Sequence, residues 1–318
     1  MGKYRVYYDD SAFGRGAGRA GREIAVDRRF YWGGKWLVPS VYICRKGLVV
    51  ELFKKVEQDK IQRFMAKYGI DENSDEEGFS EEMRMNIERD NPLNEDVRLS
   101  ANINGEELRC AFSSSDCFSP LDTDCDSDIK RAIDYYRLDK NSYWLRIRAS
   151  LPLKQKCRRV SALSLTLKAN GKPVPGIHFT ADKSGDKVNF TCPTDGKQYT
   201  LTVESMEKEQ LNLFDEDGIC AHFTVMSYTV SPELPKSAMT VVDLSRGENM
   251  HGTMPRYDGA AAIGIIGGAD GPTVITALPN SDNLRTACSS VAASDGHKAD
   301  WFIIFFPEPK EDIVLKIR

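Results

Sequence analysis

Apolar residues recur along this chain with two periods, one helical and one extended, and the helical period is confined to the first 140 residues. In Val56–Tyr68 the apolar positions fall near one face of a helix. A second helix is predicted at Ser80–Arg89, because a serine followed by acidic residues is typical of a helix N-terminus. A third helix is predicted at Asp128–Leu138.

Other runs in the first 140 residues indicate strands. They are Tyr4–Tyr8, a glycine-bearing hairpin over Phe30–Pro39, Val41–Phe53 with a kink at Gly47, and the pair Val97–Ile103 and Glu107–Phe112. Asn104 and Gly105 join the last pair, and Asn-Gly between alternating runs is the strongest short hairpin signal.

From residue 142 onward alternating runs dominate. The predicted strands are Tyr143–Leu151, Val160–Lys168, Val188–Cys192, Tyr199–Val203, Phe223–Val230, Met239–Leu244, Trp301–Phe306 and Ile313–Ile317. The turn signals between them are typical of antiparallel sandwiches and barrels. We therefore predict a β-rich α+β fold, with antiparallel sandwich or barrel-like sheets and a few N-terminal helices. Residues 1–140 are expected to form an α+β part and residues 141–318 a mostly β part, either as two domains or as one continuous domain.

Composition narrows the class of protein. The chain has 318 residues, of which 41% are hydrophobic and 28% charged, enough of each for a packed globular protein. The formal charge of −4 argues against nucleic acid as a partner. The arginines near the start are interpreted as a solvated arm: Arg15, Arg19, Arg22, Arg28 and Arg29. A signal-peptide pattern is missing from the first residues, and the eight scattered cysteines suit reduced thiols, so we expect a cytoplasmic protein.

The most distinctive segment is Ile263–Ile275, an apolar run interrupted by Gly-Gly-Ala-Asp-Gly-Pro. Its run IGIIGGADGPT, residues 263–273, resembles a signature of the β subunit of sodium-pumping decarboxylases, of the oxaloacetate and glutaconyl-CoA types. The resemblance implies a membrane setting in which Asp270 belongs to a sodium path. It also implies a surrounding loop of Gly267, Gly268, Gly271, Pro272 and Thr273. No counterpart of the family's other spans is found elsewhere in the chain.

The physical character of the segment predicts a soluble hairpin. Gly259–Leu278 is nominally long enough to span a bilayer, but it contains five glycines, and Asp270 alone would cost ~2.5–3.5 kcal/mol on insertion. Two apolar strands, Ala261–Ile266 and Val274–Leu278, are expected to be buried on both faces and joined by a turn at Asp270-Gly271.

Such a glycine-rich bend is either a tight buried turn or a ligand site. Consecutive glycines expose backbone N–H groups that cradle an anion, whereas carbonyl groups and an aspartate suit a cation. The candidate ligand-binding residues are Gly267, Gly268, Asp270, Gly271 and Thr273.

Two further motifs are interpreted as structural. The Gly16–Gly21 pattern lacks the long helix and the acidic residue that a dinucleotide-binding fold requires. The alternating aspartates of residues 122–128 look like the first half of a calcium loop, but Ser127 and Ile133 stand where that loop needs glycine and glutamate. Ser127 or Asp128 is therefore expected to cap a helix.

No catalytic or metal-binding constellation is assigned. A zinc site drawn from His178, Cys192, Cys220 and His222 lacks the paired spacing of such sites, so isolated sheet residues are preferred. The aromatic residues are more commonly core than a stacking platform: Tyr31, Trp32, Trp36, Tyr42, Trp144 and Trp301.

We expect a soluble binding or interaction protein rather than an enzyme. Its partner is an unknown small ligand or protein, not nucleic acid or a membrane, and a homo-oligomer and an unknown cofactor are left open. One alternative is a hydrolase-like enzyme whose site is assembled only in the fold. The other is a sodium-linked protein related to the decarboxylase subunit.

Overall fold

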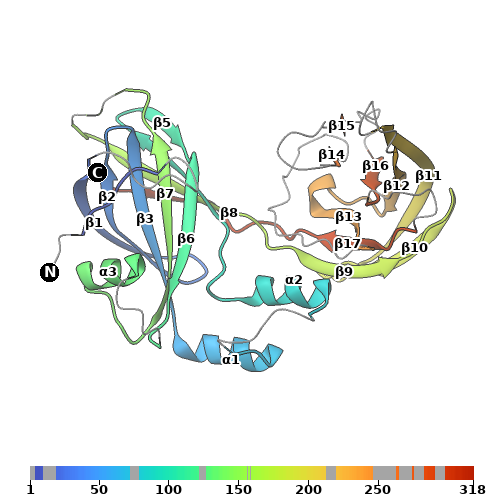
Figure 1. Cartoon of the computed structure of the whole chain (residues 1–318), viewed down its shortest axis with the longest axis horizontal. Helices are drawn as coiled ribbons and strands as arrows, with labels where there is room; N and C mark the ends of the chain where they lie inside the picture. The colour runs from blue at the N-terminus through green and yellow to red at the C-terminus, as the bar shows by residue number, and fades with distance from the viewer. Residues whose placement is uncertain are drawn as a thin grey trace. The chain divides into compact units, whose positions relative to one another are not determined.

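The computed structural model describes residues 4–9, 19–71, 79–121, 127–155, 157, 159–212, 220–245, 263–264, 274–275, 283–290 and 298–318. The chain divides into two compact units (Figure 1). Unit 1 comprises Met1–Asp75, Asp90–Asn170 and Pro309–Arg318, and unit 2 comprises Glu76–Arg89 and Gly171–Glu308. Both units are built on antiparallel sheets, which confirms the predicted β-rich α+β class.

Unit 1 is a sandwich of two sheets. The first has the strand order β1-β2-β3-β7-β6, with β1 (Arg22–Tyr31), β2 (Lys35–Ile43), β3 (Gly47–Val56), β6 (Phe112–Phe118) and β7 (Tyr143–Pro152). The second has the order β18-β8-β4-β5, with β4 (Val97–Ile103), β5 (Glu106–Arg109), β8 (Leu163–Ala169) and β18 (Ile313–Lys316).

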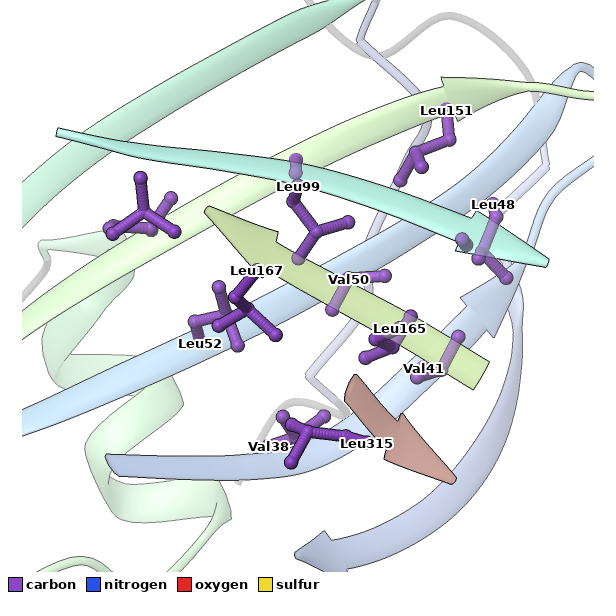
Figure 2. Close-up of a cluster of buried hydrophobic side chains, with 14 of the residues drawn as sticks. Val38, Val41, Leu48, Val50, Leu52, Leu99, Leu151, Leu165, Leu167 and Leu315 are labelled. Atoms are coloured by element: carbon purple, nitrogen blue, oxygen red, sulfur yellow. The ribbon is translucent and has the colours of Figure 1, made fainter. Parts of the chain in front are cut away.

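One apolar core lies between these two sheets. Figure 2 shows side chains of the first sheet, among them Leu48, Val50 and Leu52, facing Leu165 and Leu167 of the second. Successive strand residues point to opposite faces, so the alternate residues of β3 are left on the outer face of the five-stranded sheet. The core therefore determines which side chains reach that outer face.

The outer face of the five-stranded sheet is also covered. Helix α3 (Asp128–Tyr135) packs Ile129 and Ile133 against it, and Val6 of the segment 4–9 packs against β2 and β3. Strand β7 is consequently buried on both faces. The alternation of apolar and polar residues in its sequence is typical of a half-buried strand, but here α3 and residues 4–9 cover the face that would otherwise contact solvent.

Unit 2 is a second sandwich. One sheet has the order β10-β11-β12-β16, with β10 (Lys187–Thr191), β11 (Gln198–Asn212), β12 (Cys220–Ser231) and β16 (Arg285–Cys288). The other has the order β13-β17-β9, with β9 (Val174–Phe179), β13 (Met239–Asp243) and β17 (Trp301–Phe305). Helix α2 (Glu81–Asp90) packs Met85 against Phe302 and Ile304, on the outer face of the three-stranded sheet.

The predicted helices and the Asn-Gly hairpin are confirmed within a few residues. Besides α2 and α3, α1 spans Gln58–Tyr68. The Ser80 hydroxyl accepts a hydrogen bond from Met83 N at 3.2 Å, and the Ser127 hydroxyl accepts one from Lys130 N at 3.4 Å. Asn104 and Gly105 have φ values of 53° and 90°, the left-handed conformation that a two-residue hairpin turn requires.

Two strand predictions are wrong. Residues 4–9 form no strand, although Val6 O accepts a hydrogen bond from Gly21 N at 2.8 Å. The run Val41–Phe53 is not one kinked strand, because the chain reverses between Cys44 and Gly47 and separates β2 from β3. A Cβ atom at Gly47 would lie 2.3 Å from Leu151 O, so the glycine is required by close backbone approach rather than by a kink.

The observed units do not follow a division at residue 140. Strands β7 and β8 come after that residue, yet β7 pairs with β3 and β6, and β8 pairs with β4, so both belong to unit 1. The predicted solvated arm is wrong for three of its five arginines, because Arg22, Arg28 and Arg29 lie in strand β1.

Candidate functional site

The outer face of the five-stranded sheet carries a cluster of charged and tyrosine side chains beneath α3. Glu51 of β3 stands directly opposite Arg148 of β7. Asp116 of β6 stands directly opposite Arg146 of β7. Because directly opposite residues share a face, the sheet register alone brings these four charges together. Asp128, the first residue of α3, completes the set from above the sheet.

Arg146 uses all three nitrogens of its guanidinium group in this cluster. Its Nε donates to Asp116 Oδ1 at 2.8 Å, and Nη2 donates to Asp128 Oδ2 at 2.9 Å. Its Nη1 donates to the Tyr4 hydroxyl at 3.0 Å. The Arg146 side chain is only 4% exposed, so these bonds replace the hydration of a buried cation.

Glu51 is the fully buried centre of the cluster, with an exposed fraction of 0%. Its Oε1 accepts hydrogen bonds from Arg148 Nη2 at 2.9 Å and from the Tyr4 hydroxyl at 2.7 Å. Its Oε2 accepts one from the Tyr136 hydroxyl at 2.7 Å, and Tyr136 in turn contacts the Tyr42 hydroxyl. A buried carboxylate is tolerated here because each oxygen has donors.

The electrostatics of the cluster keep its two tyrosines neutral and Asp128 ionised. Burial, reinforced by the charge of Glu51, raises the pKa of Tyr4 and of Tyr136, so both hydroxyls remain protonated donors. Burial opposes ionisation of Asp128, but the charges and hydrogen bonds of Arg148 and Arg146 outweigh it and lower the pKa of that carboxyl.

This arrangement ties three parts of unit 1 together. Tyr4 belongs to the segment 4–9, Asp128 to α3 and Glu51 to the sheet, and the two arginines bond to all three. The donors and acceptors satisfy one another, so we assign the cluster to structural support. In the sequence, the polar residues at alternate positions of Trp144–Arg148 are a weak signal for this cluster, because the same alternation is found in a strand with one face in solvent.

The glycine-aspartate segment is observed at its two limbs. Strand β14 (Ile263–Gly264) pairs antiparallel with β15 (Val274–Ile275), with Ile263 opposite Ile275. The predicted pairing of the two apolar runs is therefore found at these residues. The candidate ligand-binding residues between the limbs lie outside the described residues: Gly267, Gly268, Asp270, Gly271 and Thr273.

Unit 2 anchors the chain on both sides of that segment. Before it, the Asp243 carboxylate accepts backbone hydrogen bonds from Ser245 and Asp300 at 2.9 Å and from Ser290 at 2.8 Å. After it, Arg285 of β16 is 7% exposed, and its guanidinium donates to Pro235 O at 3.2 Å and to Leu234 O. These bonds tie the ends of β13 and β16 to one another and to the loop that precedes β13.

The four residues considered for zinc do not converge in the part of the chain that the structure describes. His178 Nδ1 lies 2.9 Å from Asp300 Oδ2, whereas the thiol of the buried Cys192 lies 3.0 Å from Thr194 Oγ1. His222 sits on β12 opposite Gln210, and the side chain of Cys220 lies outside the described residues. Among the described side chains no group of three or more His, Cys, Asp or Glu could hold a metal ion.

Of the four aspartates considered for calcium, the structure describes only Asp128, and its carboxylate binds arginines. Asp128 binds Arg146 and Arg148, and Ser127 caps α3, as the helix-cap interpretation predicted. The aromatic residues are mostly core: Trp32, Trp36, Tyr42, Trp144 and Trp301 are buried, and Tyr31 is exposed.

The six cysteines whose side chains are described are free thiols, in line with the sequence-based expectation for these positions. In the described part of the chain no helix is long and apolar enough to cross a membrane. Comparisons of the chain with protein-family models, curated proteins and solved structures find no match. Fold and site geometry alone therefore support the functional assignment.

Proposed function

We propose that this protein is a soluble binding or interaction protein, and that residues 267–273 contribute contacts to its ligand. The observation that carries the proposal is the anchoring of segment 246–282 on unit 2. Asp243 holds the chain before the segment through three backbone N–H groups, and Arg285 holds it afterwards through backbone carbonyls.

Binding residues occur disproportionately on segments that a rigid scaffold positions. Residues 246–282 connect β13 to β16, two strands of one sandwich, and carry the short strands β14 and β15 between them. The paired limbs β14 and β15 bring the ends of 265–273 together, as a binding turn requires.

The ligand is a small molecule or ion that contacts backbone and one carboxylate. Glycine N–H groups at 267, 268 and 271 suit an anionic oxygen, and Asp270 suits a cation or a ligand hydroxyl group. We place the protein in the cytoplasm on the same sequence grounds as above, and cell fractionation tests that location.

A hydrolase is the second candidate, because His178 and Asp300 form an oriented pair. A carboxylate on Nδ1 holds an imidazole ring in place for proton transfer at Nε2, and the His178 side chain is 46% exposed. This candidate requires ester or amide hydrolysis that is lost in His178→Ala. A sodium-linked protein, the third candidate, requires a melting temperature that differs between sodium and potassium.

The proposal is tested by a thermal-shift screen of metals, nucleotides, sugars and acyl-CoA compounds on the wild type and on Asp270→Ala. We expect a ligand that raises the melting temperature of the wild type but not of the variant. Asp195→Ala is a control, because Asp195 likewise precedes a glycine in the sequence and only accepts local hydrogen bonds, among them one from Lys197 N at 3.0 Å. Equal ligand shifts in the wild type and Asp270→Ala, or no shift with any compound, would remove the proposal.

A further inference from the structure

One end of the unit 1 sandwich collects positive charge. We call it the basic end and define it by six exposed side chains: Arg19, Arg22, Arg45, Lys46, Lys154 and Arg159. They come from three separate stretches of sequence. The whole chain carries a formal charge of −4, so the charge at this end has the opposite sign to the net charge of the chain.

Backbone contacts bring the three stretches to the same end. Arg22 pairs with Ile43, the last residue of β2, so β1 begins beside the β2–β3 turn. Lys46 O in that turn accepts a hydrogen bond from Leu153 N at 3.0 Å, which fixes the chain after β7 beside it. In Figure 1 the turn lies where β3 begins, at the end of unit 1 opposite the connection to α1.

The β4–β5 hairpin holds the rest of the basic end in place. Asn104 Nδ2 donates to Arg159 O at 2.8 Å. Glu106 Oε1 accepts a hydrogen bond from Lys154 N at 3.0 Å. The cations are therefore carried by chain that hydrogen bonds attach to the sandwich.

Part of the charge at this end is uncompensated. Within the described residues, Arg19, Arg45, Lys154 and Arg159 take part in no ion pair, whereas Arg22 and Lys46 have contacts of their own. The neighbouring carboxylates have other contacts: Glu106 accepts the Lys154 backbone N–H, Glu23 accepts hydrogen bonds from the Ser40 and Tyr135 hydroxyls, and Asp9 acts on Cys44 beside the turn. Like charges held together repel, and an anionic partner relieves that repulsion.

The residue types at the basic end favour carboxylates of a protein. Four of the six cations are arginines, whose planar forks match carboxylates or phosphates in bidentate fashion, and the formal charge of −4 of the whole chain disfavours a nucleic acid. None of the large exposed hydrophobic side chains of the described residues belongs to the three stretches of the basic end: Tyr31, Leu121, Tyr135, Ile177 and Val314. The Tyr8 ring beside the β2–β3 turn is half-buried against Gly47, so these stretches offer no large exposed hydrophobic side chain for stacking on bases or for insertion into a lipid surface.

We propose that the basic end docks an acidic segment of a partner protein through salt-sensitive contacts. This inference rests on the proposed function in treating the chain as a binding protein. It uses residues of unit 1 alone, so its test is separate from that of residues 267–273.

The test measures binding of fluorescent poly-L-glutamate to the full chain at low and at physiological salt. We expect binding that weakens with salt and that falls about tenfold or more in Arg45→Glu/Arg159→Glu. The control Arg28→Glu/Arg98→Glu makes the same change of charge at two exposed strand positions away from the basic end, and we expect it to lose about twofold or less.

Three results would overturn the inference. The first is no binding of poly-L-glutamate by the wild type at low salt. The second is an equal loss of binding in the control variant. The third is tighter binding of a single-stranded oligonucleotide, or of vesicles containing phosphatidylserine, than of poly-L-glutamate. The two proposals can fail separately. If poly-L-glutamate does not bind as expected, but a ligand raises the melting temperature of the wild type and not that of Asp270→Ala, this inference is wrong and the proposed function is supported.

Discussion

Glu51 on β3 lies directly opposite Arg148 on β7, and its Oε1 accepts a hydrogen bond from Arg148 Nη2 at 2.9 Å. Glu51 is buried under α3 and the segment 4–9, Arg148 is partly buried there, and tyrosine hydroxyls also donate to the carboxylate. Removing one partner from such a set leaves the other charge buried without compensation, which is costlier than the net contribution of the intact pair.

Replacement of this carboxylate is therefore expected to be severe. Glu51→Gln should lower the free energy of unfolding by about 3–5 kcal/mol, because the buried Arg146 and the partly buried Arg148 lose their central counter-charge. Urea denaturation measures the change. Glu57→Gln is the matched control: Glu57 pairs with Lys35 at 2.8 Å on the surface, and its loss should cost about 1 kcal/mol or less. Equal costs for the two variants would contradict the role assigned to Glu51.

Gly47 is expected to be intolerant of any side chain. A Cβ atom there would lie 2.2 Å from Tyr8 Cε2 and 2.3 Å from Leu151 O. Gly47→Ala should destabilise unit 1 by about 1–3 kcal/mol through overpacking. The double variant Gly47→Ala/Tyr8→Ala separates the two clashes, because it relieves the ring contact and leaves the carbonyl contact. Thermal unfolding of these two variants and of Tyr8→Ala gives the coupling free energy between the two positions. Strictly additive changes would show that the Tyr8 ring does not clash with a side chain at position 47.

Arg285 is expected to hold the edge of unit 2. Burial lowers the pKa of its guanidinium, which nevertheless bonds to the carbonyls of Leu234 and Pro235. Arg285→Met keeps the apolar volume but orphans these carbonyls, at a cost of about 1–3 kcal/mol. Arg109→Met, at an 88% exposed side chain, should change stability by about 0.5 kcal/mol or less. Chemical denaturation followed by intrinsic fluorescence distinguishes the two.

Acid is expected to destabilise unit 1 through Asp139. The hydroxyl of Ser142, the N–H of Asn141 and the ammonium group of Lys55 lower the pKa of this carboxyl from 3.8 to about 2. A depressed pKa stabilises the fold above the ordinary value, and that contribution is lost as pH falls from about 4 towards 2. Asp139→Asn should make the melting temperature less dependent on pH in this window. An unchanged slope would show that Asp139 does not contribute to acid sensitivity.

Local signals in the sequence were sufficient for much of the secondary structure. Ser80 and Ser127 marked helix starts, and Asn104-Gly105 marked a hairpin, because caps and turns depend on a few adjacent residues. The antiparallel pairing of the runs around Ile263 and Ile275 was also predictable from their apolar character and the glycines between them.

Tertiary structure decided the features that depend on residues far apart in the chain. The alternation of Arg146 and Arg148 with apolar neighbours fits a solvent-facing strand, and only the packing of α3 and residues 4–9 made Arg146 a buried partner of Glu51 and Arg148 a partly buried one. Likewise Arg22, Arg45 and Arg159 share one end of the sandwich only because the strand pairings place their turns together. The local sequence determines the spacing of apolar residues and the positions of turns. Burial and the clustering of charges depend instead on which strands and helices pack together, and this long-range pairing cannot be read from a short stretch of sequence.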